Sequence, residues 1–362
     1  MKGRGAANNP PNRFDRLRYV RTAADLPPQY GERGEPVDPS LEIDPGTVLI
    51  RDATRTILST NDSPDVGFDT SLNPYRGCMH GCAYCYARPN HEYLGFSAGL
   101  DFETHILVKE RAPELLRKRL GLPSWKPQVI AFSGVTDAYQ PVERKLEITR
   151  RCLRVLADYR NPVAIITKNW LITRDIDVLG ELASIGAASV VLSVTTLDAK
   201  LQTRLEPKAS RPSKRLAAIE QLASAGIPVG VNVAPVIPGL TDHEIPAIVR
   251  AASDAGASFA GMIMLRLPYG VKRIFEDWLE QHAPDRKEKV LNRVREMRGG
   301  QLYDANFAFR GRGTGLFAEQ TQELFRLACR RAGLDAKGPE LSVEKFRCAG
   351  ASRQMGLFED PA

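Results

Sequence analysis

Residues 188–239 read ASVVLSVTTLDAKLQTRLEPKASRPSKRLAAIEQLASAGIPVGVNVAPVIPG. The apolar run at 188–196 is followed by a segment with helical periodicity at 213–226, which ends on Gly226, and then by a second apolar run at 227–239. Short apolar runs on either side of a helix are typical of strands that are buried on both faces of a parallel sheet. A glycine at the end of a helix supplies the left-handed residue that terminates it. The stretch therefore predicts one strand–helix–strand unit.

The same rhythm extends in both directions along the chain. Further apolar runs occupy 128–134, 162–168 and 258–268, and segments with helical periodicity occupy 142–159, 174–186 and 242–256. In the segment 142–159 the residues Leu146, Thr149, Leu153 and Leu156 form one stripe. Evenly spaced strand–helix units favour a complete or partial (β/α) barrel of the TIM-barrel-like kind over a doubly wound open sheet. Functional residues are then expected at the carboxyl ends of the strands.

The segments outside this rhythm divide the chain into three parts. Residues 1–45 are rich in Pro, Gly, Asn and Arg, and we expect a disordered or extended arm laid over the domain. The barrel is assigned to 46–268, and the alternating pattern at 47–61 predicts a small hairpin at its start. Residues 269–362 form a C-terminal helical extension with a tail, and Cys329 is expected on the apolar face of its last helix.

The composition is that of an ordinary globular protein, with 43% hydrophobic and 26% charged residues in 362. No apolar run approaches the roughly 18 residues of a membrane span, and the N-terminus lacks the apolar core of a secretory signal. A cytoplasmic protein with no membrane partner is therefore expected. The net charge of +7 permits a nucleic-acid partner without requiring one.

Half of the cysteines lie close together. The stretch YRGCMHGCAYCYARPN at 75–90 contains Cys78, Cys82 and Cys85 at a C-x3-C-x2-C spacing, whereas the other three are scattered through the chain. Gly77 and Gly81 precede the first two cysteines, so a tight loop can direct three thiolates towards one point. In a reducing compartment such clustering indicates a metal site more than a disulfide.

Two kinds of metal site are compatible with this spacing. Structural zinc takes four ligands, and His80 or His91 would have to supply the fourth, because the usual second ligand pair is missing. An iron–sulfur cluster held by three thiolates leaves one iron open to a cofactor or substrate. The spacing favours the iron–sulfur cluster, and a non-catalytic iron–sulfur or zinc binding module with a structural metal site remains the alternative.

The segment CMHGCAYCY at 78–86 resembles the signature of the radical S-adenosylmethionine (SAM) enzymes, in which an aromatic residue precedes the last cysteine. The resemblance implies a partial (β/α)6 barrel and a [4Fe–4S] cluster on Cys78, Cys82 and Cys85. It also implies that SAM binds the fourth iron and is cleaved by one electron. The product is a 5′-deoxyadenosyl radical, which abstracts hydrogen from the substrate. An electron donor of the flavodoxin or ferredoxin type is then expected.

Further segments resemble the spore-photoproduct-lyase-like branch of this superfamily, over about residues 70–265. They are YCYA at 84–87, SGVTDAY at 133–139, ITK at 166–168, LSVTT at 192–196, RLEPKASRPSKRLAAI at 204–219 and VNVAPVIPG at 231–239. The photoproduct lyases carry a cysteine hydrogen donor in the loop after the second strand. This chain has Gly134 and Val135 there. We therefore expect a substrate other than a thymine photoproduct.

The resemblance also assigns roles to aromatic and hydroxyl-bearing residues. It implies that Tyr84 packs near the adenine of SAM and that Tyr86 lies near the ribose or the radical, which makes Tyr86 the candidate catalytic residue. Ser193 would bond the ribose or the methionyl group. Loop packing is the alternative for both tyrosines, and a backbone hydrogen bond is the alternative for Ser193.

Charged residues at the strand ends receive the remaining roles. SGVTD replaces the family's Gly-Gly-Glu motif, so Thr136 and Asp137 would bind the SAM amino group, and Lys168 would pair with the SAM carboxylate. Asp137 can alternatively cap the following helix. Arg204 and Glu206 would clamp SAM or each other, and a plain ion pair between them is the expectation.

Two features hint at nucleic acid. The tail segment Gln354-Met355-Gly356-Leu357-Phe358 resembles the peptide with which bacterial proteins bind the DNA sliding clamp, although the tail can instead fold onto its own domain. The stretch 286–331 is basic, and its FRGRGTG segment offers Arg310 and Arg312 to phosphates. Solvated helix faces are the alternative for these charges.

Overall fold

The structure is a computed structural model that describes residues 3–14 and 46–347. Its centre is a seven-stranded sheet in the order β10-β9-β8-β7-β6-β3-β2, in which every neighbouring pair from β3 to β10 is parallel and β2 is antiparallel to β3. The strands are β2 (Leu58–Thr60), β3 (Thr70–Leu72), β6 (Ile130–Phe132), β7 (Val163–Thr167), β8 (Ala188–Val194), β9 (Val229–Val236) and β10 (Phe259–Met264). The α/β class and the six parallel strands of a partial (β/α)6 barrel are thus confirmed.

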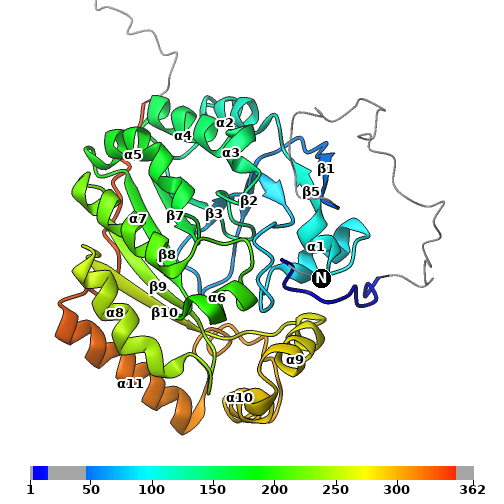
Figure 1. Ribbon diagram of the computed structural model, residues 1–362. Coiled ribbons are helices and arrows are strands. Elements are labelled where there is room, and N and C mark those ends of the chain that lie inside the picture. Colours follow the sequence, from blue (N-terminus) through cyan, green and yellow to red (C-terminus); the bar gives the residue numbers. More distant parts are fainter. Residues whose placement is uncertain (1–2, 15–45, 348–362) are drawn as a thin grey trace, which may run out of the picture.

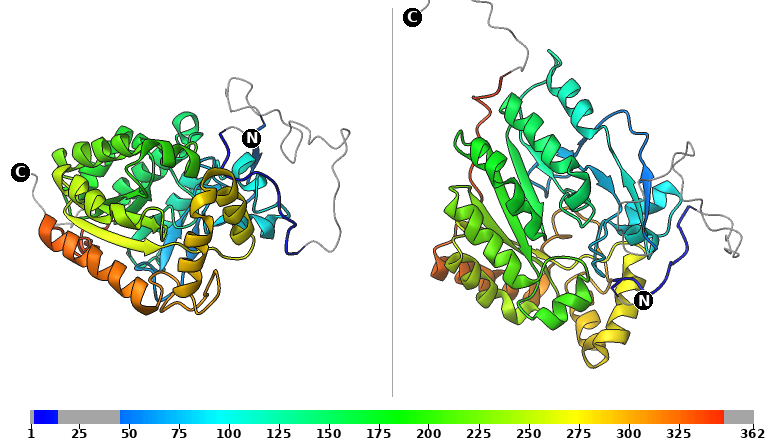
Figure 2. Two further views of the ribbon diagram at one scale, coloured as in Figure 1. Left: turned by 60° about the horizontal axis from the view of Figure 1, so that its bottom comes forward. Right: turned by 45° about the horizontal axis from the view of Figure 1, so that its top comes forward.

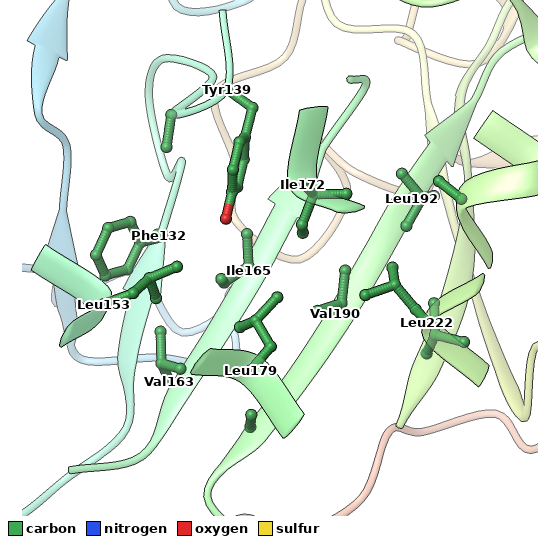
Figure 3. Packing of buried hydrophobic residues seen from close by; sticks show 14 of the residues in the cluster. Phe132, Tyr139, Leu153, Val163, Ile165, Ile172, Leu179, Val190, Leu192 and Leu222 are labelled. Carbon is green, nitrogen blue, oxygen red and sulfur yellow. The ribbon is translucent and has the colours of Figure 1, made fainter. Parts of the chain in front are cut away.

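Helices cover the outer face of this sheet (Figure 1). They are α2 (Ala112–Leu120), α4 (Ile148–Tyr159), α5 (Ile176–Ala183), α7 (Pro212–Ser224) and α8 (Ile245–Asp254). Figure 3 shows Leu153, Leu179 and Leu222 of these helices pointing at strand residues such as Val163 and Val190. All of these side chains are fully buried, so the apolar stripe of each helix meets the apolar run of its strands.

The glycines that end the predicted helices have the expected conformation. Gly186, Gly226 and Gly256 have φ angles of 70°, 72° and 96°. These values lie in the left-handed region that glycine adopts without steric cost. The rhythm of helix, glycine and strand is therefore confirmed at each of these turns.

The hairpin expected at 47–61 is wrong. β1 (Val48–Arg51) pairs in parallel with β5 (His105–Val108) in a separate sheet of order β1-β5-β4, where β4 is Tyr75–Arg76. β2 pairs with β3 instead. The local alternation of apolar and polar residues identified both strands. It cannot specify which strand each one pairs with, and both pair with strands outside 47–61.

The helix expected at 142–159 is interrupted at Glu147. Its φ of 51° separates α3 (Glu143–Leu146) from α4. The buried Glu143 carboxylate explains the break, because it accepts hydrogen bonds from the backbone N–H of Thr149 and Arg150 at the start of α4. The chain turns between the two helices so that the Glu143 carboxylate of α3 can bind the N-terminal end of α4.

The remaining elements flank the barrel. They are α1 (Asp101–Thr104), α6 (Ala199–Leu205), α9 (Val271–His282), α10 (Pro284–Glu296), α11 (Gly315–Ala332) and three 3-10 segments at Arg88–Leu94, Trp170–Asp175 and Asp242–Glu244. α11 packs on α8, and its Cys329 is buried as expected. Residues 3–14 run past α1 and α9 (Figure 2), where Ala6 packs against Ala98 and Ile274. None of the helices within the described residues is long and apolar enough to span a membrane.

Candidate active site

The three clustered cysteines lie on a loop that directly follows β4. Gly77 and Gly81 on this loop have φ angles of 79° and 66°, and a side chain at either position would meet neighbouring atoms within 2.8 Å. The Cys78 N–H donates to the Phe102 carbonyl at 2.9 Å, which fixes the start of the loop. Only glycine satisfies both the backbone conformation and the close approach at these two positions.

All nine residues predicted for the site come together in one cavity. It has a volume of about 800 Å³ and opens at the carboxyl ends of β6 to β10. The predicted residues that line it are Cys78, Cys82, Tyr84, Cys85, Tyr86, Thr136, Asp137, Lys168 and Ser193. Asn232, Ala234 and Pro235 of β9 line it too. The cavity therefore lies at the edge of the sheet where parallel (β/α) folds carry their functional residues.

Three thiols on one loop beside a cavity are the donor set that an iron–sulfur cluster takes. Burial raises the pKa of the Cys85 thiol to about 11 and that of Cys82 well above its usual range. Such thiols remain protonated near neutral pH unless a metal displaces the proton. Cys152 and Cys329 are also buried, but they lie in the core and in α11 rather than on this cavity.

The described residues contain no preformed site for a single metal ion. Within residues 3–14 and 46–347, no three His, Cys, Asp or Glu side chains are placed to hold one ion together. Both histidines considered as a fourth ligand already have partners, and His80 interacts with the Cys78 thiol as well as with Asp137. His91 Nε2 lies 2.9 Å from the His105 carbonyl, and His80 Nδ1 lies 3.4 Å from Asp137. A cubane needs no such convergence, because each thiolate binds its own iron.

A fully buried carboxylate, Glu206, organises one wall of the cavity. It accepts a hydrogen bond from the Tyr84 hydroxyl, forms an ion pair with Arg215 and lies 3.3 Å from Lys168 Nζ. Burial alone would raise the Glu206 pKa, but the Arg215 and Lys168 charges outweigh it and hold that pKa well below its usual range. The wall is thus a connected network of charges, which the sequence did not suggest.

The expected pairing of Arg204 with Glu206 is wrong. Arg204 reaches towards the His282 carbonyl at 3.5 Å, and Arg215 from the first turn of α7 takes the carboxylate. Arg204 lies on α6, and the chain turns directly after it, so the two neighbouring side chains diverge. Neither Arg215 nor Thr195, which donates to Glu206 at 2.7 Å, carried any local signal for this role.

Asp137 is bound mainly by the protein itself. Its carboxylate accepts hydrogen bonds from the Thr167 hydroxyl and the Lys168 backbone N–H, both at 2.8 Å, and from the Tyr139 N–H at 2.9 Å. Burial opposes ionisation of Asp137, but His80 and these donors hold its pKa below the usual range. Asp137 therefore ties the loop after β6 to the end of β7.

The other predicted residues present polar groups to the cavity. Lys168 Nζ donates to the Ala234 carbonyl at 2.8 Å, and the Thr136 hydroxyl donates to the Tyr75 carbonyl at 3.0 Å. The Ser193 hydroxyl has no hydrogen-bond partner within the described part of the chain. The Tyr86 hydroxyl donates to the Gly134 carbonyl at 2.8 Å, and 46% of the residue is exposed.

The cysteine loop is supported from behind by a buried ion pair. Arg88 contacts Glu103 at 2.5 Å and also donates to the Cys82 carbonyl at 3.0 Å. Glu103 in turn accepts the backbone N–H groups of Gly5 and Ala6 at 3.1 and 2.9 Å. The N-terminal segment, which the sequence assigned only to an arm, thus contacts the support of the loop directly.

The fold and the site together define a barrel protein with three cluster-type cysteines beside a cavity at its strand ends. The family model of the radical SAM superfamily matches residues 72–252, which is half of the chain. The chain therefore belongs to the radical SAM superfamily, which implies a [4Fe–4S] cluster and SAM as cofactors.

Individual similar proteins match more of the chain than the family model does. An uncharacterised protein of Mycobacterium bovis is 35% identical over 232 residues, covering 64% of this chain and 67% of that protein. An uncharacterised protein of Methanocaldococcus jannaschii is 29% identical over 223 residues, covering 62% and 80%. A structure of spore photoproduct lyase complexed with dinucleoside spore photoproduct has a TM-score of 0.58 at 17% identity, covering 80% of this chain and 81% of that one. The resemblance to that branch is confirmed at the level of the fold.

Proposed function

We propose that this protein is a radical SAM enzyme that cleaves SAM reductively and uses the resulting radical to abstract hydrogen from a substrate. The observation that carries the proposal is that the cysteine loop and the six predicted SAM-contacting residues line the same cavity. When bound, a [4Fe–4S] cluster would supply the electron that cleaves SAM. The cysteines Cys78, Cys82 and Cys85 would hold it.

The residues of the chain divide the binding of SAM among them. Lys168 carries the positive charge that a carboxylate needs, and the unpartnered Ser193 hydroxyl is available to a ribose or methionyl group. The Thr136 oxygen keeps a lone pair to accept from an ammonium group, because its own proton is donated to Tyr75. Since the Asp137 carboxylate is already engaged, we propose that it positions Lys168 rather than binding the amino group itself.

The substrate is proposed to differ from a thymine photoproduct. Within the described residues, Cys78, Cys82 and Cys85 are the cysteines that line the cavity, and all three are assigned to the cluster. The loop after β6 contributes Ser133, Gly134 and Val135 instead of a thiol. A reaction that ends with hydrogen transfer from a cysteine at this loop therefore lacks its donor.

Two protein partners are proposed, an electron donor and a DNA sliding clamp. A flavodoxin or ferredoxin would deliver the electron, as the superfamily assignment suggests. The clamp-like segment Gln354–Phe358 and Cys348 lie outside the described residues. Binding of the full chain to a sliding clamp, compared with a chain that lacks 354–358, tests the tail; equal binding of the two would contradict it.

The proposal is tested by anaerobic reconstitution followed by reduction with dithionite in the presence of SAM. The wild-type protein should be brown and should release methionine and 5′-deoxyadenosine. Cys82→Ala should lose the colour and the cleavage, whereas the matched control Cys329→Ala, in α11, should keep both. Lys168→Ala should keep the colour and bind SAM more weakly. A wild-type protein that is brown but does not cleave SAM would support the structural-site alternative instead.

A further inference from the structure

One side of the partial barrel is closed by a segment from the C-terminal extension. Residues 306–312, which we call the strap, connect the two edges of the main sheet. The Gly311 carbonyl accepts the Met264 N–H at 2.9 Å at the end of β10. Arg310 forms two hydrogen bonds of 2.5 Å with Asp65 in the loop between β2 and β3. Phe307, Ala308, Gly311 and Arg312 of the strap line the cavity, so the strap forms its outer wall.

The strap is held by a buried arginine without a carboxylate partner. Arg298 is 4% exposed and donates to the carbonyls of Leu265, Phe309 and Arg310 at 3.0, 2.5 and 2.8 Å. Its Nε–H has no partner in the described part of the chain. The three carbonyl groups accept most of the hydrogen bonds that the guanidinium can donate, but none of them carries the negative charge that would neutralise it. Arg298 therefore fixes the backbone beside Arg266 and Arg310 and adds positive potential to this wall.

Two further arginines on the wall form no ion pair within the described residues, although the Asp65 carboxylate, which is paired with Arg310, lies near enough to Arg266 for the two charges to interact. Arg266 and Arg312 line the cavity, and neither forms a hydrogen bond or ion pair through its guanidinium within the described residues. The Arg266 guanidinium stacks on the Tyr86 ring at 4.2 Å, which holds it beside the candidate catalytic residue. Arg310 differs from them, because its Nε and Nη2 atoms both donate to the Asp65 carboxylate.

The other charged side chains that line the cavity each face a group of opposite charge. Lys168 faces Glu206 at 3.3 Å, and Asp137 faces His80 at 3.4 Å. Because Glu206 is shared between Lys168 and Arg215, positive charge remains there too, and Arg266 and Arg312 add further positive charge on the strap side. Apolar side chains also line the cavity, with Phe68, Val135, Met262 and Ile263 among them. The cavity is thus suited to a molecule with an apolar or planar body and an anionic group at one end.

We infer that Arg266 and Arg312 form an anion-binding subsite that recognises a phosphate group of the substrate. This inference rests on the proposed function and names the substrate class. Guanidinium groups bind phosphate oxygens through paired N–H donors, and two of them together match a doubly charged group better than a single carboxylate. Because Arg266 stacks on Tyr86, a phosphate bound there brings the rest of the substrate next to the predicted position of the radical.

The experiment measures equilibrium binding of phosphate-bearing probes to the reconstituted full-length protein, without reduction. The probes are thymidine 5′-monophosphate, a short oligothymidylate and unphosphorylated thymidine. Both phosphate-bearing probes should bind, with an affinity that falls as salt rises, and thymidine should bind far more weakly. A clear preference for the monophosphate assigns the group to a free phosphate ester, and a clear preference for the oligonucleotide assigns it to a strand.

Variants then locate the subsite. Arg266→Gln and Arg312→Gln should each weaken binding about tenfold, the loss expected for one charge-assisted interaction. Arg266→Lys, which keeps the charge, should recover part of the affinity. Arg286→Gln on the exposed face of α10 removes the same charge away from the cavity and should have no effect.

Two results would overturn the subsite: no binding of either phosphate-bearing probe, or equal weakening by Arg286→Gln and by the two cavity variants. Neither outcome depends on SAM cleavage. A protein that cleaves SAM but ignores phosphate refutes the subsite alone. A protein that binds phosphate through these arginines but never cleaves SAM refutes the proposed function alone.

Discussion

At the scale of single residues, Glu206 is a buried carboxylate that joins four side chains at and behind the cavity wall. Tyr84, Thr195, Lys168 and Arg215 all point at its carboxylate. Arg215 is fully buried, so it depends on Glu206 for its neutralisation. Removal of one member of a buried pair leaves the other charged and without compensation, which is far more costly than the loss of an exposed pair.

We therefore expect Glu206→Gln to lower the free energy of unfolding by about 3–5 kcal/mol at neutral pH. Urea denaturation of the metal-free protein measures this loss. Glu220→Gln, which removes an exposed carboxylate from the same helix as Arg215, is the matched control and should change the stability by less than about 0.5 kcal/mol. Equal stability of the two variants would contradict the assigned role.

The pH dependence of this loss has a definite sign. Folding lowers the Glu206 pKa below its ordinary value of 4.5, so the carboxylate stabilises the folded state most fully above that pH. As the pH falls below 4.5, the wild type loses this contribution progressively and Glu206→Gln does not. The stability difference between the two should therefore shrink in acid, and a constant difference from pH 7 down to pH 3 would contradict it.

At the scale of elements, the N-terminal segment 3–14 supports the cysteine loop, a role that its sequence pattern did not indicate. Gly5 lies so close to the cysteine loop that an added Cβ would be 1.6 Å from the Gly81 carbonyl oxygen and 3.0 Å from the Ala83 nitrogen. Its N–H and that of Ala6 are bound by Glu103, which also holds Arg88 behind Cys82. The segment thus closes the back of the loop whose front carries the cysteines.

Gly5→Ala should displace this segment and loosen the cysteine loop. We expect the free energy of unfolding to fall by about 1–3 kcal/mol, the usual cost of inserting an atom into a packed site. Hydrogen exchange should speed up at the amides of 77–88, and the reconstituted protein should lose its visible absorption faster in air. Gly180→Ala, where the added Cβ of α5 meets nothing within 4 Å, serves as the control. Unchanged exchange at 77–88 in Gly5→Ala would show that the segment does not support the loop.

The elements also show what the sequence could predict and what it could not. The strand–helix units from 128 to 268 were predictable because parallel strands that are buried on both faces leave continuous apolar runs. The meeting of the strand-end residues in one cavity was predictable because such a sheet brings its carboxyl ends together, whereas the cysteines were found from their spacing. The pairing of β1 and β2 could not be predicted, because it depends on contacts with other segments of the chain. The same holds for the ion pair of Glu206 with Arg215 instead of Arg204.

At the scale of the whole molecule, the cavity is assembled from residues that are far apart in the chain. The cysteine loop and the strand ends come from the barrel, and the strap comes from the C-terminal extension. The contact between Asp65 and Arg310 joins residues that are 245 positions apart, which no local pattern reveals. FRGRGTG was noted for its charge, yet its place in the lining of the cavity follows only from the path of the chain past β10.

The central claim is that three cysteines hold a cluster with one iron open to SAM. The most direct test is electron paramagnetic resonance of the anaerobically reconstituted and reduced full chain, recorded before and after addition of SAM. We predict the signal of a reduced [4Fe–4S] cluster whose shape changes when SAM is added, and its loss in Cys82→Ala. A colourless protein that contains zinc, or a cluster signal that SAM leaves unchanged, would contradict the account.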